Sequence, residues 1–342
     1  MAQHFDAIVI GTGQSGPALA HRLAKAGRRC AIAERKHFSG TCVNNGCIPT
    51  KSLIASARAA HVARRAAEFG VLVEGRVRVD MKAVKARKDA IVKVSNEGVE
   101  EGLREAEGIT VFTGHARFVG QWEVAVGDDL LTAGQVFINV GGRADIPPIP
   151  GIERVAWLDN SSMMAVDFLP SHLVILGGSY IGLEFGQMYR RFGSEVTIIQ
   201  RNAQLVPRED PDIAQAIREI LEDEGIRILT DADATQIESR GGAVAVSVTA
   251  GGETSEVVGS HLLVATGRRP NTDDLGLEAA GVETDRAATS RSTASCAPTF
   301  RASLRWATAT ASPRSPTPRT TTSRSSPATC STARSAGSRI GS

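Results

Sequence analysis

Short apolar runs alternate with amphipathic stretches over the first 285 residues, a pattern typical of an α/β protein. Runs of apolar residues predict strands, and stretches with helical periodicity between them predict helices. The predicted elements of the first half are strands at 5–10, 30–33, 109–111, 115–118, 122–126 and 136–140, and helices at 17–26, 52–69 and 81–105. A chain of 342 residues with 42% hydrophobic content can bury two or more cores.

The same plan repeats after the proline-rich stretch 147–151, which is typical of a connection between domains. The predicted elements of the second half are strands at 173–176, 196–199 and from 262 onward, helices at 183–192 and 210–224, and two or three short strands before 248. This repetition predicts two Rossmann-like domains, one at 1–150 and one at 151–270.

A glycine-rich turn follows the first predicted strand. It contains Gly11, Gly13 and Gly16, and Glu34 ends the next strand, 21 residues after Gly13. Such glycines let a pyrophosphate approach the backbone at a helix N-terminus, and the carboxylate accepts hydrogen bonds from ribose hydroxyls. The glycine pattern alone is weak evidence, but strand, turn, helix, strand and acid together indicate a dinucleotide site.

A second turn of this kind begins 166 positions later. Gly177 and Gly182 keep their places, whereas Ser179 replaces the middle glycine and leaves less room beside a phosphate. The following strand ends in Gln200 and Arg201, where a site for NAD usually has a carboxylate. Loss of the acid and gain of a cation favour NADPH over NADH. The alternative is that Arg201 merely lies on a solvated surface.

Two cysteines five positions apart, Cys42 and Cys47, lie between these turns. On a regular helix the axial rise between them would be about 7.5 Å, too far for a disulfide. A bridge therefore needs a distorted turn, which Gly46 and Pro49 favour. Together with the basic Lys51, this spacing indicates a redox-active cysteine pair. The alternatives are inert buried thiols or half of a metal site, but no second cysteine pair follows and we expect no metal site.

Charge and hydropathy exclude several partners. Of 39 basic residues, nine Arg lie in 286–342, which has no acidic residue, so residues 1–285 carry 30 basic and 37 acidic residues. The apparent basicity belongs to the tail, and we expect no nucleic-acid partner. The first apolar run, 7–10, leads straight into a glycine turn, so we expect no secretory signal, and we expect no apolar run to cross a membrane. We therefore expect a cytoplasmic protein, in which a disulfide is catalytic rather than structural.

Residues 5–285 resemble the FAD-dependent pyridine nucleotide-disulfide oxidoreductases, which include glutathione reductase, dihydrolipoamide dehydrogenase and mercuric reductase. Four motifs carry the resemblance in family order: G-x-G-x-x-G, G-T-C-V-N-N-G-C-I-P-T-K, G-G-S-Y-I-G-L-E and A-T-G-R-R-P-N. Within the family, the chain looks most like mercuric-reductase-like enzymes, with the substrate left open. The resemblance implies that the second domain is inserted in the first, with 271–285 returning to the FAD domain.

The resemblance also implies residue roles in a relay from NADPH through FAD to a Cys42–Cys47 disulfide and on to a small-molecule or disulfide substrate. Cys47 would face the flavin, and Cys42 would attack the substrate as a thiolate. Lys51 would lie beside the flavin, paired with Glu184, and the two would be buried together. The implied FAD contacts are Gly11, Gly13, Gly16, Glu34, Gly40, Thr41, Lys51, Ala116 and Gly142, and the implied NADPH contacts are Gly177, Gly182, Arg201 and Gly267. His115 is expected to bond backbone rather than act as an acid or base.

The sequence after Asp285 departs from the family and becomes rich in Ser, Thr, Ala, Arg and Pro, which cannot form a core. Read one base early, 289–300 becomes compatible with I-T-V-D-G-E-L-R-T-N-V-P. Residues 301–323 likewise become compatible with G-I-F-A-L-G-D-C-N-G-V-A-A-V-T-H-T-A-Y-N-D-F, which resembles the family's second FAD segment. We therefore predict that 286–342 is a frameshift product, the alternative being a natural disordered tail.

Several expectations follow from a frameshifted end. The strand and loop that complete the FAD domain would be lost, as would the C-terminal domain through which the family forms homodimers. The family's proton-handling histidine has no candidate, because no histidine follows His261, and Cys296 and Cys330 are assigned no role. The chain would be an impaired enzyme. The alternative function is a non-catalytic nucleotide-binding or redox-sensing protein.

Overall fold

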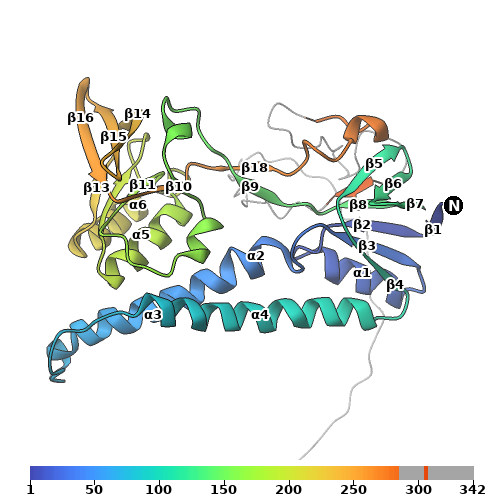
Figure 1. Cartoon of the computed structure of the whole chain (residues 1–342), viewed down its shortest axis with the longest axis horizontal. Helices are drawn as coiled ribbons and strands as arrows, with labels where there is room; N and C mark the ends of the chain where they lie inside the picture. Colours follow the sequence, from blue (N-terminus) through green and yellow to red (C-terminus); the bar gives the residue numbers. More distant parts are fainter. Residues whose placement is uncertain (285–303, 307–342) are drawn as a thin grey trace, which may run out of the picture. The chain divides into compact units, whose positions relative to one another are not determined.

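The structure, a computed structural model, describes residues 1–284 and 304–306 (Figure 1). The prediction of a frameshifted tail, with its two cysteines, otherwise lies outside the described residues. The predicted fold class is confirmed: two parallel sheets with Rossmann-like strand order are present, and the second is inserted in the first domain. All the described residues belong to one compact unit.

A five-stranded parallel sheet forms the first domain, in the order β19-β8-β2-β3-β4. Its strands are Leu304–Trp306 (β19), Val136–Ile138 (β8), Ala7–Ile10 (β2), Cys30–Glu34 (β3) and Ile109–Thr113 (β4). The strands read as near-continuous apolar runs because both faces are covered. Ala7 and Val9 face a core with helices α1 (Gly16–Lys25) and α4 (Met81–Glu105), and Ile8 and Ile10 face the opposite core.

Strand β19 corrects one expectation. The strand that completes this domain was expected to be lost, but 304–306 pairs with β8 in parallel register. The physical reason is that an edge strand presents unpaired N–H and C=O groups, with which an extended segment of almost any composition can pair.

The opposite core is closed by a small sheet and by the segment that returns from the second domain. The sheet has the order β1-β7-β6-β5, from strands Gln3–Phe5 (β1), Asp129–Ala133 (β7), Glu123–Val126 (β6) and Ala116–Gly120 (β5). Leu275, Leu277 and Val282 of the returning segment pack into this core, with the short 3₁₀ helix η4 (Leu277–Ala280). The polypeptide thus leaves the first domain and comes back to complete it.

The second domain repeats the design with the order β10-β17-β11-β12-β13. Its parallel strands are Trp157–Leu158 (β10), His261–Val264 (β17), His172–Leu176 (β11), Glu195–Ile199 (β12) and Arg227–Leu229 (β13). An antiparallel sheet of Ala232–Arg240 (β14), Ala243–Ala250 (β15) and Glu253–Gly259 (β16) covers one face. Helix α5 (Tyr180–Phe192) packs on the other face, and α6 (Pro211–Asp223) adds to the same core. Two strands, Gly142–Ala144 (β9) and Arg268–Pro270 (β18), pair antiparallel at the crossing between the domains.

Helix α3 (Cys47–Arg64) belongs to the first half of the chain but packs into the core of the second domain. Leu53 and Ala57 of α3 join one cluster with Phe185, Met188 and Tyr189 of α5. Helix α4 lies beside α3 and contributes Met81 (Figure 1). The 3₁₀ helices η1 (Ala66–Phe69), η2 (Ile152–Arg154) and η3 (Ser162–Ala165) lie in the connections.

The helix boundaries follow the sequence pattern with differences at α2 (Gly40–Asn44), α3 and α5; helix α3 also ends at Arg64 instead of residue 69. Helix α4 has the predicted bounds, and α1 and α6 deviate by one residue. Helix α3 starts at Cys47 instead of residue 52, because Pro49 lies in its first turn, where no N–H is needed for the helix. Helix α5 starts three residues early, directly after Ser179. The short helix α2 was not predicted.

Candidate functional site: two glycine turns and a dithiol

The first glycine turn joins β2 to α1. Gly11 has φ +99°, and a Cβ there would lie 2.3 Å from the carbonyl oxygen of Asn139. A Cβ on Gly16 would lie 2.3 Å from the carbonyl oxygen of Gly11. Only glycine fits these two positions, so the turn keeps an open cradle of backbone N–H groups at the start of α1. This geometry fits a pyrophosphate. Gly13 is half-buried, and its environment is less crowded.

Glu34 ends β3 beside this turn. Its Oε2 accepts hydrogen bonds from the backbone N and the Oγ1 of Thr12, at 3.1 Å and 2.6 Å, and its Oε1 accepts one from the backbone N of Lys36 at 3.0 Å. The carboxylate is thereby held at the edge of the cradle.

Helix α2 starts against the same turn. A Cβ on Gly40 would lie 2.7 Å from Cα of Gly13, so only glycine allows this approach. Ser39, which precedes it, is 2% exposed and has φ +71°, an uncommon conformation for a residue other than glycine. Its Oγ has no hydrogen-bond partner among the described residues. A buried hydroxyl without a partner beside a glycine cradle fits a site that a polar ligand completes.

The two cysteines lie on either side of a helix break. Cys42 is in α2, and Cys47 is the first residue of α3. Between them, Gly46 has φ −138° and ψ −121°, and a Cβ there would lie 2.9 Å from the Thr41 carbonyl oxygen. Both residues are free thiols, Cys42 partly buried and Cys47 exposed. Burial, followed by the side-chain hydrogen bond and charge of Cys47, raises the pKa of Cys42 to about 11. The break thus brings the two sulfurs together.

Asparagine side chains hold the segment from Cys42 to Cys47, called the redox turn below, in place. Asn160 Nδ2, from the connection before η3, donates to the Asn45 carbonyl oxygen at the break at 3.1 Å. Asn44 Nδ2 donates to the carbonyl oxygens of Phe38 and Gly40 at 2.6 Å and 2.9 Å. Asn96 of α4 donates to the side chain of Asn44 at 2.8 Å. The sequence analysis missed Asn96 and Asn160, because their partners are 52 and 115 residues away.

Lys51 of α3 and Glu184 of α5 form an ion pair. The expectation that the pair is buried is wrong: the side chain of Lys51 is 63% exposed and that of Glu184 is 36% exposed. The reason is that each residue lies on the outer side of its helix, whereas Leu53, Ala57 and Phe185 fill the buried side. The pair therefore ties α3 to α5 at the surface, one helical turn beyond Cys47.

The second glycine turn has the same backbone geometry as the first. Gly177 has φ +105°, and a Cβ there would lie 2.4 Å from the Ala265 carbonyl oxygen. A Cβ on Gly182 would lie 2.0 Å from the Gly177 carbonyl oxygen. Gln200 stands where Glu34 stands in the first site: its Oε1 accepts from the backbone N of Gly178 at 3.1 Å. Arg201 is exposed next to it.

The remaining residues with implied roles are spread over the two domains. Ala116 is buried in β5, and Gly142 starts β9. Gly267 links β17 to β18, and its carbonyl oxygen accepts a hydrogen bond from the backbone N of Asp145 at 3.0 Å. His115 Nε2 donates to the Asp274 carbonyl oxygen at 2.9 Å, so the prediction that this histidine bonds backbone is confirmed.

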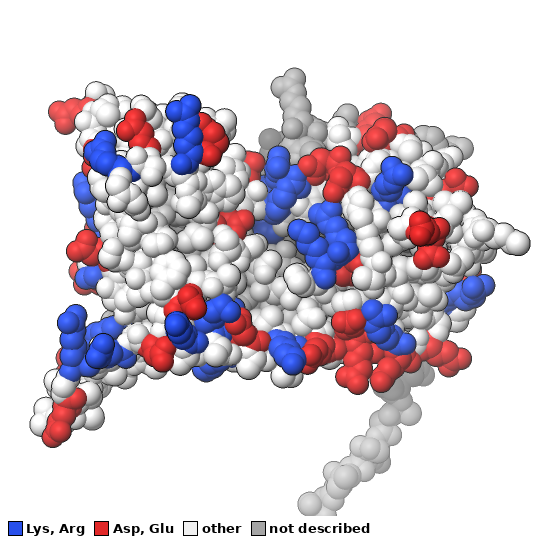
Figure 2. Space-filling view, in the orientation of Figure 1, with Lys and Arg blue, Asp and Glu red and all other residues white. Residues whose placement is uncertain are grey.

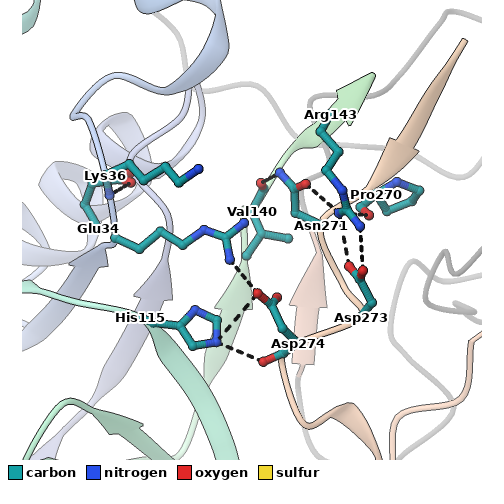
Figure 3. A network of polar contacts seen from close by, with 10 residues as sticks. Glu34, Lys36, His115, Val140, Arg143, Pro270, Asn271, Asp273 and Asp274 are labelled. Atoms are coloured by element: carbon teal, nitrogen blue, oxygen red, sulfur yellow. Dashed lines mark hydrogen bonds and ion pairs between the residues drawn. The ribbon is translucent and has the colours of Figure 1, made fainter. Parts of the chain in front are cut away.

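Charged contacts fasten the returning segment beside Glu34 (Figure 3). Arg35 Nη1 lies 2.7 Å from a carboxylate oxygen of Asp274, and Arg143 holds Asp273 through two contacts, one of them at 3.0 Å. The hydrogen bond with Arg143 lowers the pKa of Asp273. The space-filling view shows Lys and Arg interspersed with Asp and Glu on the face drawn (Figure 2).

In the part of the chain that the structure describes, no helix is both long and apolar enough to cross a membrane. The His, Cys, Asp and Glu side chains of this described part form no group of three or more that could hold a metal ion.

The chain thus has two glycine turns of dinucleotide-binding geometry and a cysteine pair held between them. This combination defines a class of redox proteins that bind two dinucleotides and carry a cysteine pair. Residues 5–297 match the family described as pyridine nucleotide-disulphide oxidoreductase, and the chain belongs to that family. Members of this family use FAD and NAD(P)H.

Named relatives support this assignment. The chain is 31% identical to a mercuric reductase of Lysinibacillus sphaericus over 283 residues, which cover 83% of this chain and 52% of the relative. It is 33% identical to a dihydrolipoyl dehydrogenase of Acholeplasma laidlawii over 291 residues, 84% of each chain. The solved HOCl-induced flavoprotein disulfide reductase RclA from Escherichia coli has a TM-score of 0.77 and 32% identity, over 88% of this chain and 65% of that one. The chain spans about half to two thirds of the length of most of these relatives.

Proposed function

We propose that the chain is an FAD-dependent disulfide reductase that takes electrons from NADPH and delivers them through the Cys42–Cys47 pair to an oxidised substrate. The observation that carries the proposal is the attachment of one cysteine pair to both glycine turns. Helix α2, with Cys42, starts against the first turn at Gly40, and helix α3, with Cys47, is paired with helix α5 of the second turn. When bound, FAD supplies two-electron transfer between a nicotinamide and a disulfide.

The residues that would hold FAD are those around the first turn. Gly11, Gly13 and Gly16 leave space for its pyrophosphate, and Glu34 accepts hydrogen bonds from its ribose. Gly40 and Thr41 bring the redox turn to the same cradle, and we assign Ala116 and Gly142 to the walls around the adenosine part. Lys51 is assigned to the reactive edge of the flavin, oriented by Glu184.

The residues that would hold NADPH surround the second turn, and Gly177, Gly182 and Gly267 form its backbone frame. Gln200 replaces a carboxylate with a neutral amide that is already hydrogen-bonded to the turn. A 2′-phosphate would therefore meet no negative charge there, and Arg201 would supply a positive one. This arrangement favours NADPH over NADH, and Gln200→Glu should reverse the preference.

Each cysteine has a separate role in the proposal. Cys47 accepts the electrons, which break the S–S bond, and two protons convert the sulfurs to thiols. The Cys42 thiolate then attacks a disulfide substrate, which breaks the substrate S–S bond, forms a mixed disulfide and releases one thiol. The Cys47 thiolate attacks the Cys42 sulfur, which restores the Cys42–Cys47 bridge and releases the second thiol. The substrate is an oxidised disulfide or a soft metal ion. The relatives named mercuric reductase support the second class.

We further propose the domain assignment 1–150 and 271–285 for FAD and 151–270 for NADPH, and a cytoplasmic location. That residues 286–342 are a frameshift product is also a proposal.

The test is to purify the full chain, add FAD and NADPH without oxygen, and follow flavin absorbance. We expect bleaching, followed by reoxidation when a disulfide substrate is added. Cys42→Ser and Cys47→Ser each remove the disulfide, so either variant should keep the bleaching of the flavin by NADPH and lose the reoxidation by a disulfide substrate. Unchanged turnover in both variants would refute the relay.

A non-catalytic redox sensor is the second candidate. The two glycine turns favour it, because their cradles could bind dinucleotides whether or not the cysteine pair passes electrons on. A chain that binds FAD and forms the disulfide reversibly, but never turns over a substrate, would support the sensor.

A further inference from the structure

The side chain of Asn139, the residue after β8, lies directly beneath the first glycine turn. Ser15 Oγ donates to Asn139 Oδ1 at 2.8 Å, and Asn139 Nδ2 donates to the Gly11 carbonyl oxygen at 3.2 Å. Because that carbonyl oxygen can only accept, the orientation of the amide is fixed. Asn139 is 5% exposed. Its amide thus joins the first residue of the turn to the last residue before α1.

The amide also occupies the space that the glycines leave. A Cβ on Gly16 would lie 2.7 Å from Asn139 Nδ2, and one on Gly13 would lie 3.4 Å from the same atom. The following residues are held from the other side: Asn271 Nδ2 donates to the Val140 carbonyl oxygen at 2.9 Å (Figure 3). Asn139 therefore has little freedom to move away from the turn.

The second turn lacks this bridge, although its backbone matches. The backbone N of Asn139 donates to the Ile10 carbonyl oxygen at 2.7 Å, and the backbone N of Ala265 donates to the Leu176 carbonyl oxygen at 2.8 Å. Ala265 is therefore the counterpart of Asn139. The counterpart of Ser15, 166 positions later, is Ile181. Neither counterpart has a polar side chain, so the second turn has no such cross-link.

We propose that Asn139 and Ser15 are positioning residues that make the first dinucleotide a retained group, while the second dinucleotide exchanges. The inference rests on the proposed function, with FAD in the first site and NADPH in the second. A turn that is already held in its bound conformation loses less freedom on binding, so its ligand binds more tightly and leaves more slowly. A turn without the cross-link releases its ligand faster. Fast release suits NADPH, because a reductant that is consumed in each turnover must leave the site after it is oxidised.

The test compares the affinities of the two sites in the full-length apoprotein. FAD binding is titrated by flavin fluorescence, and NADPH binding by the fluorescence of NADPH itself. Two hydrogen bonds of ordinary net strength correspond to about a ten- to thirtyfold change in Kd. Asn139→Ala should weaken FAD binding by about that factor and leave the Kd of NADPH unchanged. Ser15→Ala should weaken FAD binding by about three- to tenfold, since it removes one bond.

A matched control is available in Ser194→Ala, because Ser194 is also buried and donates one hydrogen bond, to the Pro170 carbonyl oxygen at 2.6 Å. It should leave both affinities unchanged. If Asn139→Ala does not fold, the FAD affinities of Ser15→Ala and Ser194→Ala are compared instead. A loss of FAD affinity in Ser15→Ala alone supports the inference. Equal losses at both sites, or no loss of FAD affinity, would overturn the inference while leaving the proposed function intact. An unsubstituted chain that binds no FAD would overturn both.

Discussion

The reactivity of Cys42 gives the sharpest prediction. In the reduced protein, its pKa of about 11 leaves roughly 0.01% thiolate at pH 7, against about 3% for an ordinary cysteine with a pKa of about 8.5. The thiolate population is thus lower by about 300-fold. A more basic thiolate is intrinsically more nucleophilic, by about tenfold here for a Brønsted slope of about 0.4–0.5. Cys42 should therefore be alkylated about 20- to 30-fold more slowly than an ordinary cysteine at pH 7.

The assay is the rate of iodoacetamide labelling of the reduced protein from pH 7 to 11.5, with peptide fragmentation to assign the label to Cys42. A protonated thiol does not react, so the logarithm of the rate should rise with pH at unit slope and level off only near pH 11. Cys47→Ala removes the hydrogen bond and charge that raise the pKa but leaves the burial, which is the larger cause. Its rate should level off at a lower pH, still above that of an ordinary cysteine. A plateau below pH 9 in the unsubstituted protein would refute the reasoning.

Three further predictions concern stability, measured by urea unfolding of the apoprotein. A double-mutant cycle on Lys51 and Glu184 should give a coupling of only about 0.2–1 kcal/mol, because the pair is exposed, and a value above about 2 kcal/mol would indicate burial. Ser39→Gly should stabilise the apoprotein by about 0.5–1 kcal/mol, because it relieves a left-handed backbone conformation, and a loss of stability would contradict that strain. Arg64→Ala should destabilise by about 1–2 kcal/mol, because Arg64 donates to the carbonyl oxygens of Arg191 and Phe192 at the end of α5. Arg65→Ala, whose ion pair with Glu68 is solvent-exposed, is its control and should change little, and equal effects would count against the capping role.

Much of the fold could be predicted because its signals are local. Hydrophobic periodicity gave the bounds of α4, and the glycines at 11, 16, 177 and 182 marked both turns because no other residue fits there. Local reasoning also predicted that the chain between Cys42 and Cys47 must depart from a regular helix. It did not predict where α3 starts, because a proline in the first turn is compatible with a helix as well as with a break.

The polar residues that support the site could not be predicted. Asn139 pairs with residues 124 and 128 positions away, and Asn160 reaches the redox turn across 115 positions. Nothing in the neighbouring sequence of these asparagines distinguishes them from surface residues. The exposure of Lys51 was also missed, because the sequence indicates a pairing partner but not which side of a helix will be covered.

The core shared by α3 and α5 limits how parts of such proteins can be exchanged. A chimera that takes its nicotinamide domain from a relative, joined at residue 150, would leave Leu53, Ala57 and Met81 facing foreign side chains. The mismatch would disturb the helix that begins at Cys47. A graft that carries helices α3 and α4 together with the second sheet keeps that interface intact, so the useful unit of recombination crosses the boundary that the linear sequence suggests.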